Sequence, residues 1–168
     1  MRKFIQYLTI AAGLGTGMVL PACADDAAPA ATETNANVSV AEALNKTKFV
    51  TGAPMADAKY YIYVFSASWC GPCRALMPRI VEQYPAMKEN KVEVILISCD
   101  QTEEVAKNYV EHYKAGLPGL YVKDPGVRNL PGIFMPRGIP TAIIVDAKGN
   151  VLSSGHGAKA LEWQKVCK

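Results

Sequence analysis

The chain has 168 residues, of which 50% are hydrophobic and 20% are charged. This length suits one domain with its own core and is too short for two ordinary domains. The formal net charge is only +3, from 18 Lys and Arg residues against 15 Asp and Glu residues. The basic residues do not cluster, so no nucleic-acid partner is expected.

The first 24 residues have the layout of a secretory signal. Two basic residues precede an apolar run from Phe4 to Leu20, and small residues follow this run. The small residues around Cys23 fit a cleavage site after Ala24. We therefore expect residues 1–24 to be a signal peptide.

Two alternatives to this cleaved signal stay open. The segment LPAC resembles the bacterial lipoprotein box, in which the signal ends before Cys23 and that residue carries a lipid anchor. The apolar run could also remain as an uncleaved anchor helix, although polar residues and glycines interrupt it. All three arrangements place the domain outside the cytoplasm. We expect a protein of the bacterial periplasm, soluble or lipid-anchored.

The segment after the signal has a different composition from the rest of the chain. Residues 25–45 are rich in Ala, Thr and Asn and contain no aromatic residue. This composition predicts a flexible tether. The folded domain is then expected to span residues 46–168.

Within this domain the hydrophobic pattern predicts strands and helices that alternate. A capping box of Asp100 and Glu103 marks the start of the second helix, and Pro78 should kink the first. A Lys148-Gly149 turn predicts a hairpin near the end of the chain. The expected order is strand, helix, strand, helix, hairpin and helix, over about residues 60–67, 71–90, 92–98, 100–113, 141–154 and 158–166.

The segment between Gly116 and Pro140 interrupts this pattern. Ten of its 25 residues are Gly or Pro, so no long regular element is expected there. A loop of this length in a compact domain is usually functional or disordered. We expect its part from 116 to 136 to influence the choice of partner.

Two cysteines, Cys70 and Cys73, stand where the first predicted strand meets the start of the first helix. Unpaired backbone N–H groups and the helix dipole favour a thiolate at Cys70, which is therefore the expected attacking thiol. Cys73 lies one turn further into the helix and can resolve a mixed disulfide. Pro72 costs no hydrogen bond near a helix start and restricts the loop.

Other roles for this cysteine pair are less favoured. A zinc site needs two more ligands at close spacing, and the other Cys and His residues after residue 60 stand singly. Haem attachment needs a His directly after the second cysteine, where the chain has Arg74. A structural disulfide stays open, although so tight a ring is easily reduced. The single residues are Cys99, His112, His156 and Cys167.

The motif WCGPC at residues 69–73, with a proline further along the helix, and the segment RGIPT at residues 137–141 resemble the thioredoxin superfamily. The sequence around these two motifs is most similar to the tryparedoxin and nucleoredoxin branch and to periplasmic thioredoxin-like proteins. The resemblance covers about residues 60–157. It implies an α/β, thioredoxin-like fold, in which a central mixed β-sheet is flanked by helices.

The resemblance also assigns roles around the two thiols. In this family a cis-proline loop packs against the dithiol, which makes Pro140 the expected cis-proline. The residue before it, here Ile139, pairs through its backbone with the substrate peptide. Trp69, Gly71 and Pro72 are expected to complete the substrate-binding rim.

The chain departs from the family pattern at one informative position. Thioredoxins proper carry a buried carboxylate that handles the proton of the resolving thiol, and this chain has Val64 in its place. His156 could tune the thiols, although a lone His in a Gly turn is more often simply solvated. Cys99 and Cys167 are expected to be core residues or to pair with each other.

These features predict a thiol-disulfide oxidoreductase that reduces extracytoplasmic protein substrates through Cys70 and Cys73, without a cofactor or a metal. The Gly-Pro centre implies a reduction potential nearer to thioredoxin's, about −270 mV, than to DsbA's, about −120 mV. In oxidising surroundings such a reductase needs a membrane-bound thiol electron donor. The alternatives are a non-catalytic binding module with a structural disulfide and, with no separate motif to support it, a peroxide reductase.

Overall fold

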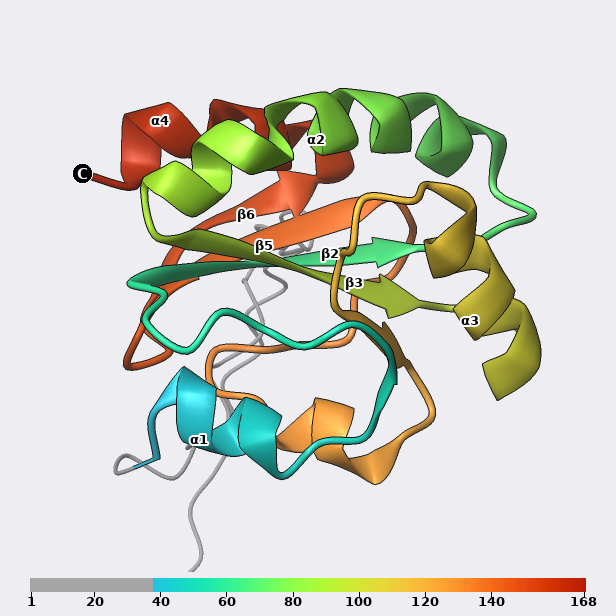
Figure 1. Ribbon diagram of the computed structural model, residues 1–168, viewed down its shortest axis with the longest axis horizontal. Coiled ribbons are helices and arrows are strands. Elements are labelled where there is room, and N and C mark those ends of the chain that lie inside the picture. Colours follow the sequence, from blue (N-terminus) through green and yellow to red (C-terminus); the bar gives the residue numbers. More distant parts are fainter. Residues whose placement is uncertain (1–37) are drawn as a thin grey trace, which may run out of the picture. The chain divides into compact units, whose positions relative to one another are not determined.

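The computed structural model describes residues 38–168, and the predicted signal, Cys23 and most of the predicted tether lie outside the described residues. Six strands form one mixed sheet in the order β1-β4-β3-β2-β5-β6, with helices on both of its faces (Figure 1). The strands are β1 Phe49–Thr51, β2 Tyr60–Ser66, β3 Val92–Ser98, β4 Gly119–Tyr121, β5 Thr141–Asp146 and β6 Val151–His156. The helices are α1 Val40–Asn45, α2 Gly71–Glu89, α3 Glu103–His112 and α4 Trp163–Val166, with 3-10 turns η1 Pro125–Asn129 and η2 Gly157–Glu162.

The two central strands, β2 and β3, form the predicted buried core of the sheet. They run parallel in register from the pair Tyr60–Val92 to the pair Ser66–Ser98. Every residue of β3 is buried, because helices cover both faces of the strand. Since parallel strands end at the same edge of a sheet, the segments that follow β2 and β3 meet there.

One hydrophobic core lies on each face of the sheet. The first is formed between the sheet and α2, α3 and the C-terminal turns, and it includes Met77, Ile80 and Trp163. The second is formed between the sheet and α1 and η1, and it includes Leu44 and Val127. The helix α2 is continuous through Pro78 and Pro85, and both prolines are exposed, so the helix keeps its apolar face on the sheet.

The ordered domain begins earlier than the sequence predicts. Ser39 caps α1 in a capping box with Glu42, and Val40 and Leu44 are completely buried in the second core. Residues 40–45 are therefore part of the fold and not of a tether. The predicted boundary at residue 46 is wrong because two well-placed apolar residues in an Ala-rich segment are enough to dock one short helix.

The Gly/Pro-rich segment contains a strand that the sequence does not predict. The strand β4 pairs in parallel with β3, and β1 pairs with β4 in the antiparallel direction. Each of β1 and β4 has only three residues, so neither shows a hydrophobic period long enough to recognise. The prediction that no long regular element lies in this segment is confirmed.

Two predicted helix boundaries need correction. The N-cap of α3 is Thr102, whose Oγ1 accepts a hydrogen bond from the N–H of Val105 at 3.2 Å, so Asp100 is not the cap. The predicted last helix is divided into η2 and α4. Among the described residues, no helix is both long enough and apolar enough to cross a membrane.

Candidate active site

The two cysteines of the WCGPC motif form a disulfide at the N-terminus of α2. Cys70 is the N-cap residue, and its Sγ accepts a hydrogen bond from the backbone N–H of Cys73 at 3.3 Å. Cys70 is 6% exposed, whereas Cys73 is completely buried. An incoming disulfide can therefore reach the sulfur of Cys70, and the helix can stabilise a negative charge there.

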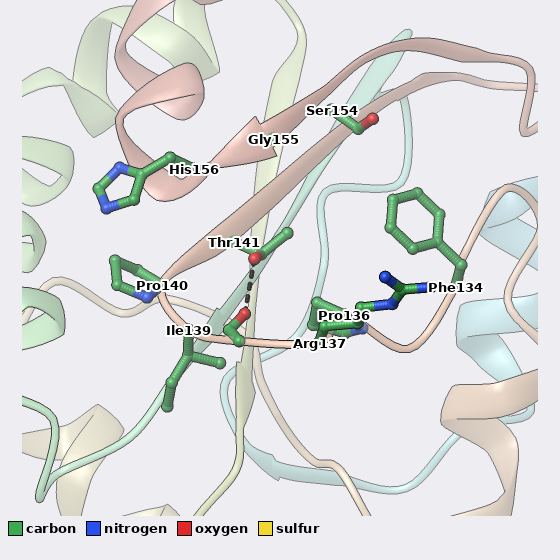
Figure 2. A pocket seen from close by; sticks show the side chains of 10 residues that line it. Phe134, Pro136, Arg137, Ile139, Pro140, Thr141, Ser154, Gly155 and His156 are labelled. Carbon is green, nitrogen blue, oxygen red and sulfur yellow. Dashed lines mark hydrogen bonds between the residues drawn. The ribbon is translucent and has the colours of Figure 1, made fainter. Parts of the chain in front are cut away.

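A cis-proline loop packs against this disulfide. The Ile139–Pro140 peptide bond is cis, as the resemblance implies, and the carbonyl oxygen of Ile139 lies 3.9 Å from the Sγ of Cys70. The hydroxyl of Thr141 donates to the carbonyl of Gly138 at 2.7 Å and ties the loop together (Figure 2). The loop thus forms one wall of the site.

Gly157 fixes the distance between this loop and α2. Its backbone N–H donates to the carbonyl of Pro140 at 2.9 Å. A Cβ atom at this position would lie 2.6 Å from Cδ2 of Leu76 and 2.7 Å from Cβ of Pro140. A larger residue here would have to displace Pro140 or the side chain of Leu76.

A buried carboxylate, Asp100, braces the loop that leads to Cys70. Asp100 is 2% exposed. Its Oδ1 accepts hydrogen bonds from the N–H of Ser68 at 3.1 Å and from the hydroxyl of Ser68 at 2.7 Å, and its Oδ2 accepts from the hydroxyl of Ser98 at 2.7 Å. The brace fixes the backbone two residues before Cys70.

The sequence assigned Asp100 to a helix cap and missed this role. The position of Asp100 in the sequence could have indicated this role. It follows the second buried strand directly, at the edge of the sheet where the loop after the first strand also lies. Val64, where thioredoxins proper have a carboxylate, is completely buried within the sheet. Asp100 is therefore the acid that the fold brings to this edge, and it acts on the loop backbone.

Cys99 and Cys167 are free thiols, so the alternative of a second disulfide between them is wrong. Cys99 packs against Ala67 and the Cys70–Cys73 pair, whereas Cys167 packs into the core below α2. Burial, and then the charge of Asp100, raise the pKa of Cys99 to about 11. Burial raises the pKa of Cys167 to about 11. Both thiols stay protonated at neutral pH.

Three residues that the resemblance assigns to the substrate-binding rim are exposed next to the two cysteines in the chain. Trp69 is 63% exposed, and Gly71 and Pro72 are exposed beside it. The cis-proline loop and the end of β6 line a cleft of about 500 Å³ (Figure 2). His156 is exposed at this cleft, and its Nδ1 accepts a hydrogen bond from the N–H of Ala158 at 3.4 Å.

No group of three or more Cys, His, Asp or Glu side chains lies close enough to form a metal site anywhere in residues 38–168. The polar side chains at the site instead fix the backbone. The arrangement can therefore exchange disulfides through an accessible sulfur at a helix N-terminus, backed by a buried second sulfur.

Comparisons with known proteins agree with this geometry. Residues 57–151 match the family described as thioredoxin-like. Thiol-disulfide oxidoreductase ResA of Bacillus cereus is 34% identical over 98 residues, which are 58% of this chain and 55% of ResA. Nucleoredoxin of Xenopus laevis is 38% identical over 102 residues, which are 58% of this chain and 24% of nucleoredoxin.

The solved structure of tryparedoxin II from C. fasciculata is 33% identical, with a TM-score of 0.56, and the match covers 74% of this chain and 91% of that one. The chain spans about half the length of ResA and about a quarter of nucleoredoxin. These matches confirm the predicted fold and its branch of relatives. The chain belongs to the thioredoxin-like family.

Proposed function

We propose that the protein is a thiol-disulfide oxidoreductase that reduces disulfides of protein substrates. The observation that carries the proposal is the position of Cys70. It caps α2, forms a disulfide with the buried Cys73, and lies 3.9 Å from the carbonyl of Ile139 in the cis-proline loop. The relatives named as thiol-disulfide oxidoreductases support the same activity.

The reduced protein begins the reaction. The thiolate of Cys70 attacks one sulfur of the substrate disulfide, and the other substrate sulfur leaves as a thiolate and takes up a proton. The thiolate of Cys73 then attacks the Sγ of Cys70, forms the Cys70–Cys73 disulfide, and releases the second substrate sulfur. The substrate gains two electrons, and the dithiol loses two.

The protein groups assist these steps in different ways. The N–H of Cys73, which donates to the Sγ of Cys70 in the disulfide, stabilises negative charge on that sulfur. Ile139 offers its backbone to the substrate segment beside the disulfide. Because Val64 replaces the carboxylate of thioredoxins proper, the proton of Cys73 passes to water or to the departing thiolate.

The surroundings in which the protein works are a further part of the proposal. The signal pattern of residues 1–24 supports a site outside the cytoplasm, in a soluble form or with a lipid on Cys23. There the dithiol must be regenerated, so a membrane-bound thiol protein supplies its electrons. The proposed location and the proposed electron donor can each be wrong without affecting the chemistry at Cys70.

The proposal is tested by trapping. In the Cys73→Ser variant, Cys70 attacks but no resolving thiol follows, so substrates remain attached as mixed disulfides that reducing agent releases. Mass spectrometry of the trapped partners identifies the substrates. The Cys70→Ser variant is the matched control and should trap nothing through residue 73, because that sulfur is buried.

A binding module with a structural disulfide makes a different prediction. A module of that kind would keep its partner when Cys70 is replaced by Ser, and it would trap no mixed disulfides. Equilibration of the dithiol with glutathione tests the direction of the reaction. The proposal expects a reduction potential near that of thioredoxin, about −270 mV, and a value near about −120 mV would contradict reductase function.

A further inference from the structure

Two clefts include residues close to the two cysteines: one contains Ile139, whose carbonyl lies 3.9 Å from Cys70 Sγ, and the other contains Arg74, which follows Cys73 in the chain. The first, which we call the Arg137 cleft, has a volume of about 500 Å³ and is lined by Ile139 and Pro140 together with Phe134, Arg137 and His156 (Figure 2). The second, the Arg74 cleft, has a volume of about 570 Å³ and includes Ser68, Arg74 and His112. A substrate segment that presents its disulfide to Cys70 extends toward one or both clefts.

The two clefts share an uneven distribution of charge. Each is lined by one arginine and one histidine, and no carboxylate is among the described residues that line either cleft. Within residues 38–168, neither Arg137 nor Arg74 takes part in an ion pair. Both guanidinium groups are exposed and positively charged at every physiological pH.

Two carboxylates on elements that line or follow the clefts have cationic partners, and the buried Asp100 is held by the hydroxyls of Ser68 and Ser98. Glu103, at the start of α3, pairs with Lys48 at 2.6 Å. Glu162, at the end of η2, pairs with Lys159 at 3.2 Å. Neither arginine is paired with a carboxylate of residues 38–168, so both are available to a carboxylate supplied by another molecule.

The Arg137 cleft also offers hydrogen-bond donors and apolar contacts. Because Nδ1 of His156 accepts from the N–H of Ala158, the Nε2 atom is the nitrogen free to donate to a ligand. Phe134 is 40% exposed at the opposite end of the cleft (Figure 2). A short peptide segment with a carboxylate and an apolar side chain matches these groups.

We propose that the substrates carry an Asp or Glu residue close to the disulfide that Cys70 attacks, and that Arg137 binds this carboxylate. This inference rests on the proposed function. Ile139 lies against Cys70, and Arg137 is two residues before it in the chain, with its guanidinium group on the side of Phe134 (Figure 2). An extended peptide rises about 3.3 Å per residue, so the carboxylate lies about two to four residues from the substrate cystine.

The chemistry favours a protein segment over other anions. A nucleic acid or an anionic lipid surface binds to larger clusters of cations. Each cleft here has a single arginine, and the Arg137 cleft includes Ile139, which lies against the sulfur that attacks a cystine. Complementary charge at such a site steers the substrate and excludes wrong partners.

The test uses the whole reduced protein and three cystine peptides that differ only at one position three residues from a cysteine, with Asp, Asn or Lys there. We expect kcat/KM to be about fivefold higher for the Asp peptide than for the Asn peptide, and lower again for the Lys peptide. The preference should decrease in 0.5 M salt, because exposed ion pairs are screened at about that concentration. Equal values for the three peptides would overturn the inference.

Variants then assign the preference to one residue. In Arg137→Glu the order of the Asp and Lys peptides should reverse, and in Arg137→Gln their ratio should approach one. The matched control is Arg128→Gln, which changes an exposed arginine of η1 that lines neither cleft. The Arg128→Gln variant should keep the wild-type ratio, and an equal change there would contradict a specific role of Arg137.

A neutral small disulfide separates this inference from the proposed function. Hydroxyethyl disulfide has no charge, so the wild-type protein should reduce it through Cys70 whatever peptide it prefers. If the wild-type protein does not reduce it, the proposed function fails. If the protein reduces it and shows no preference among the peptides, only the inference about acidic substrates fails.

Discussion

Cys70 and Cys99 both follow central strands of the sheet, at the same edge, and their surroundings differ. After β2 the chain makes a three-residue connection and places Cys70 at the N-terminus of α2, where a backbone N–H points at its sulfur. After β3 the chain places Cys99 directly at the end of the strand, where burial and Asp100 raise its pKa to about 11. Although the two residues pack in one cluster, only Cys70 is placed for reaction.

The comparison shows what makes a thiol reactive in this fold. Proximity to the disulfide does not by itself make a thiol reactive, because Cys99 also lies close to the disulfide. Cys70 also has a backbone donor that favours its thiolate, whereas the charge of Asp100 raises the pKa of Cys99. The following predictions test each part of this difference.

The largest effect is expected from Cys70→Ser, with Cys99→Ser as the comparison. Cys70→Ser should abolish reduction of protein disulfides, because it removes the attacking sulfur. Cys99→Ser should keep the rate within about twofold, since a thiol with so high a pKa supplies almost no nucleophile. The rate at which each variant reduces a protein disulfide, with dithiothreitol as the electron donor, measures both effects. Loss of activity in Cys99→Ser, in a variant that still folds, would contradict the assignment.

The next effect concerns the cis-proline loop, which packs against Cys70. Gly157→Ala should lower both stability and activity, because the new methyl group would meet Leu76 and Pro140 at 2.6 and 2.7 Å. Overpacking of this kind costs about 1–3 kcal/mol. Urea denaturation and the reduction rate measure the two losses. Gly71→Ala is the control for stability, since an added Cβ there meets nothing within 4 Å.

A smaller effect is expected from the carboxylate that links the two strand ends. Asp100→Asn removes the charge and part of the bonding to Ser68 and Ser98, which should cost about 1–3 kcal/mol of stability. It should also lower the pKa of Cys99, since the charge of Asp100 contributes to raising it. Alkylation of Cys99 at pH 8 should therefore become faster. An unchanged alkylation rate would show that burial alone controls this thiol.

The smallest effect is expected at Cys167, which is far from the site in the core below α2. Its pKa is also raised to about 11, and burial is the only cause. Asp100→Asn should therefore leave the alkylation rate of Cys167 unchanged while that of Cys99 increases. A parallel increase at both thiols would indicate general loosening of the fold rather than a local charge effect.

The elements that carry Cys70 could be predicted from the sequence because they are long and periodic. The strands β2 and β3 are rich in β-branched and aromatic residues, and α2 repeats its buried residues at helical spacing. The cis-proline followed from the resemblance of a short motif. These features depend on local sequence, which is why they were visible without coordinates.

The features around Cys99 could not be predicted in the same way, since they depend on contacts between distant segments. The strands β1 and β4 exist only because residues near 50 and near 120 pair with each other. The bonds from Asp100 to Ser68 span 32 positions along the chain, and so the capping pattern of Asp100 misled the prediction. The absence of a Cys99–Cys167 bond likewise follows from their packing in separate clusters.

The most direct test of the central claim is the pH dependence of alkylation at each cysteine of the reduced protein, measured with iodoacetamide and peptide mass mapping. At pH 8 a thiol with a pKa of about 11 is ionised in about one molecule in a thousand. We therefore expect Cys99 and Cys167 to react about tenfold faster with each added pH unit up to that value, and Cys70 to reach its plateau below the free-cysteine pKa of about 8.5. A Cys70 that reacts no faster than Cys99 at neutral pH would contradict the account.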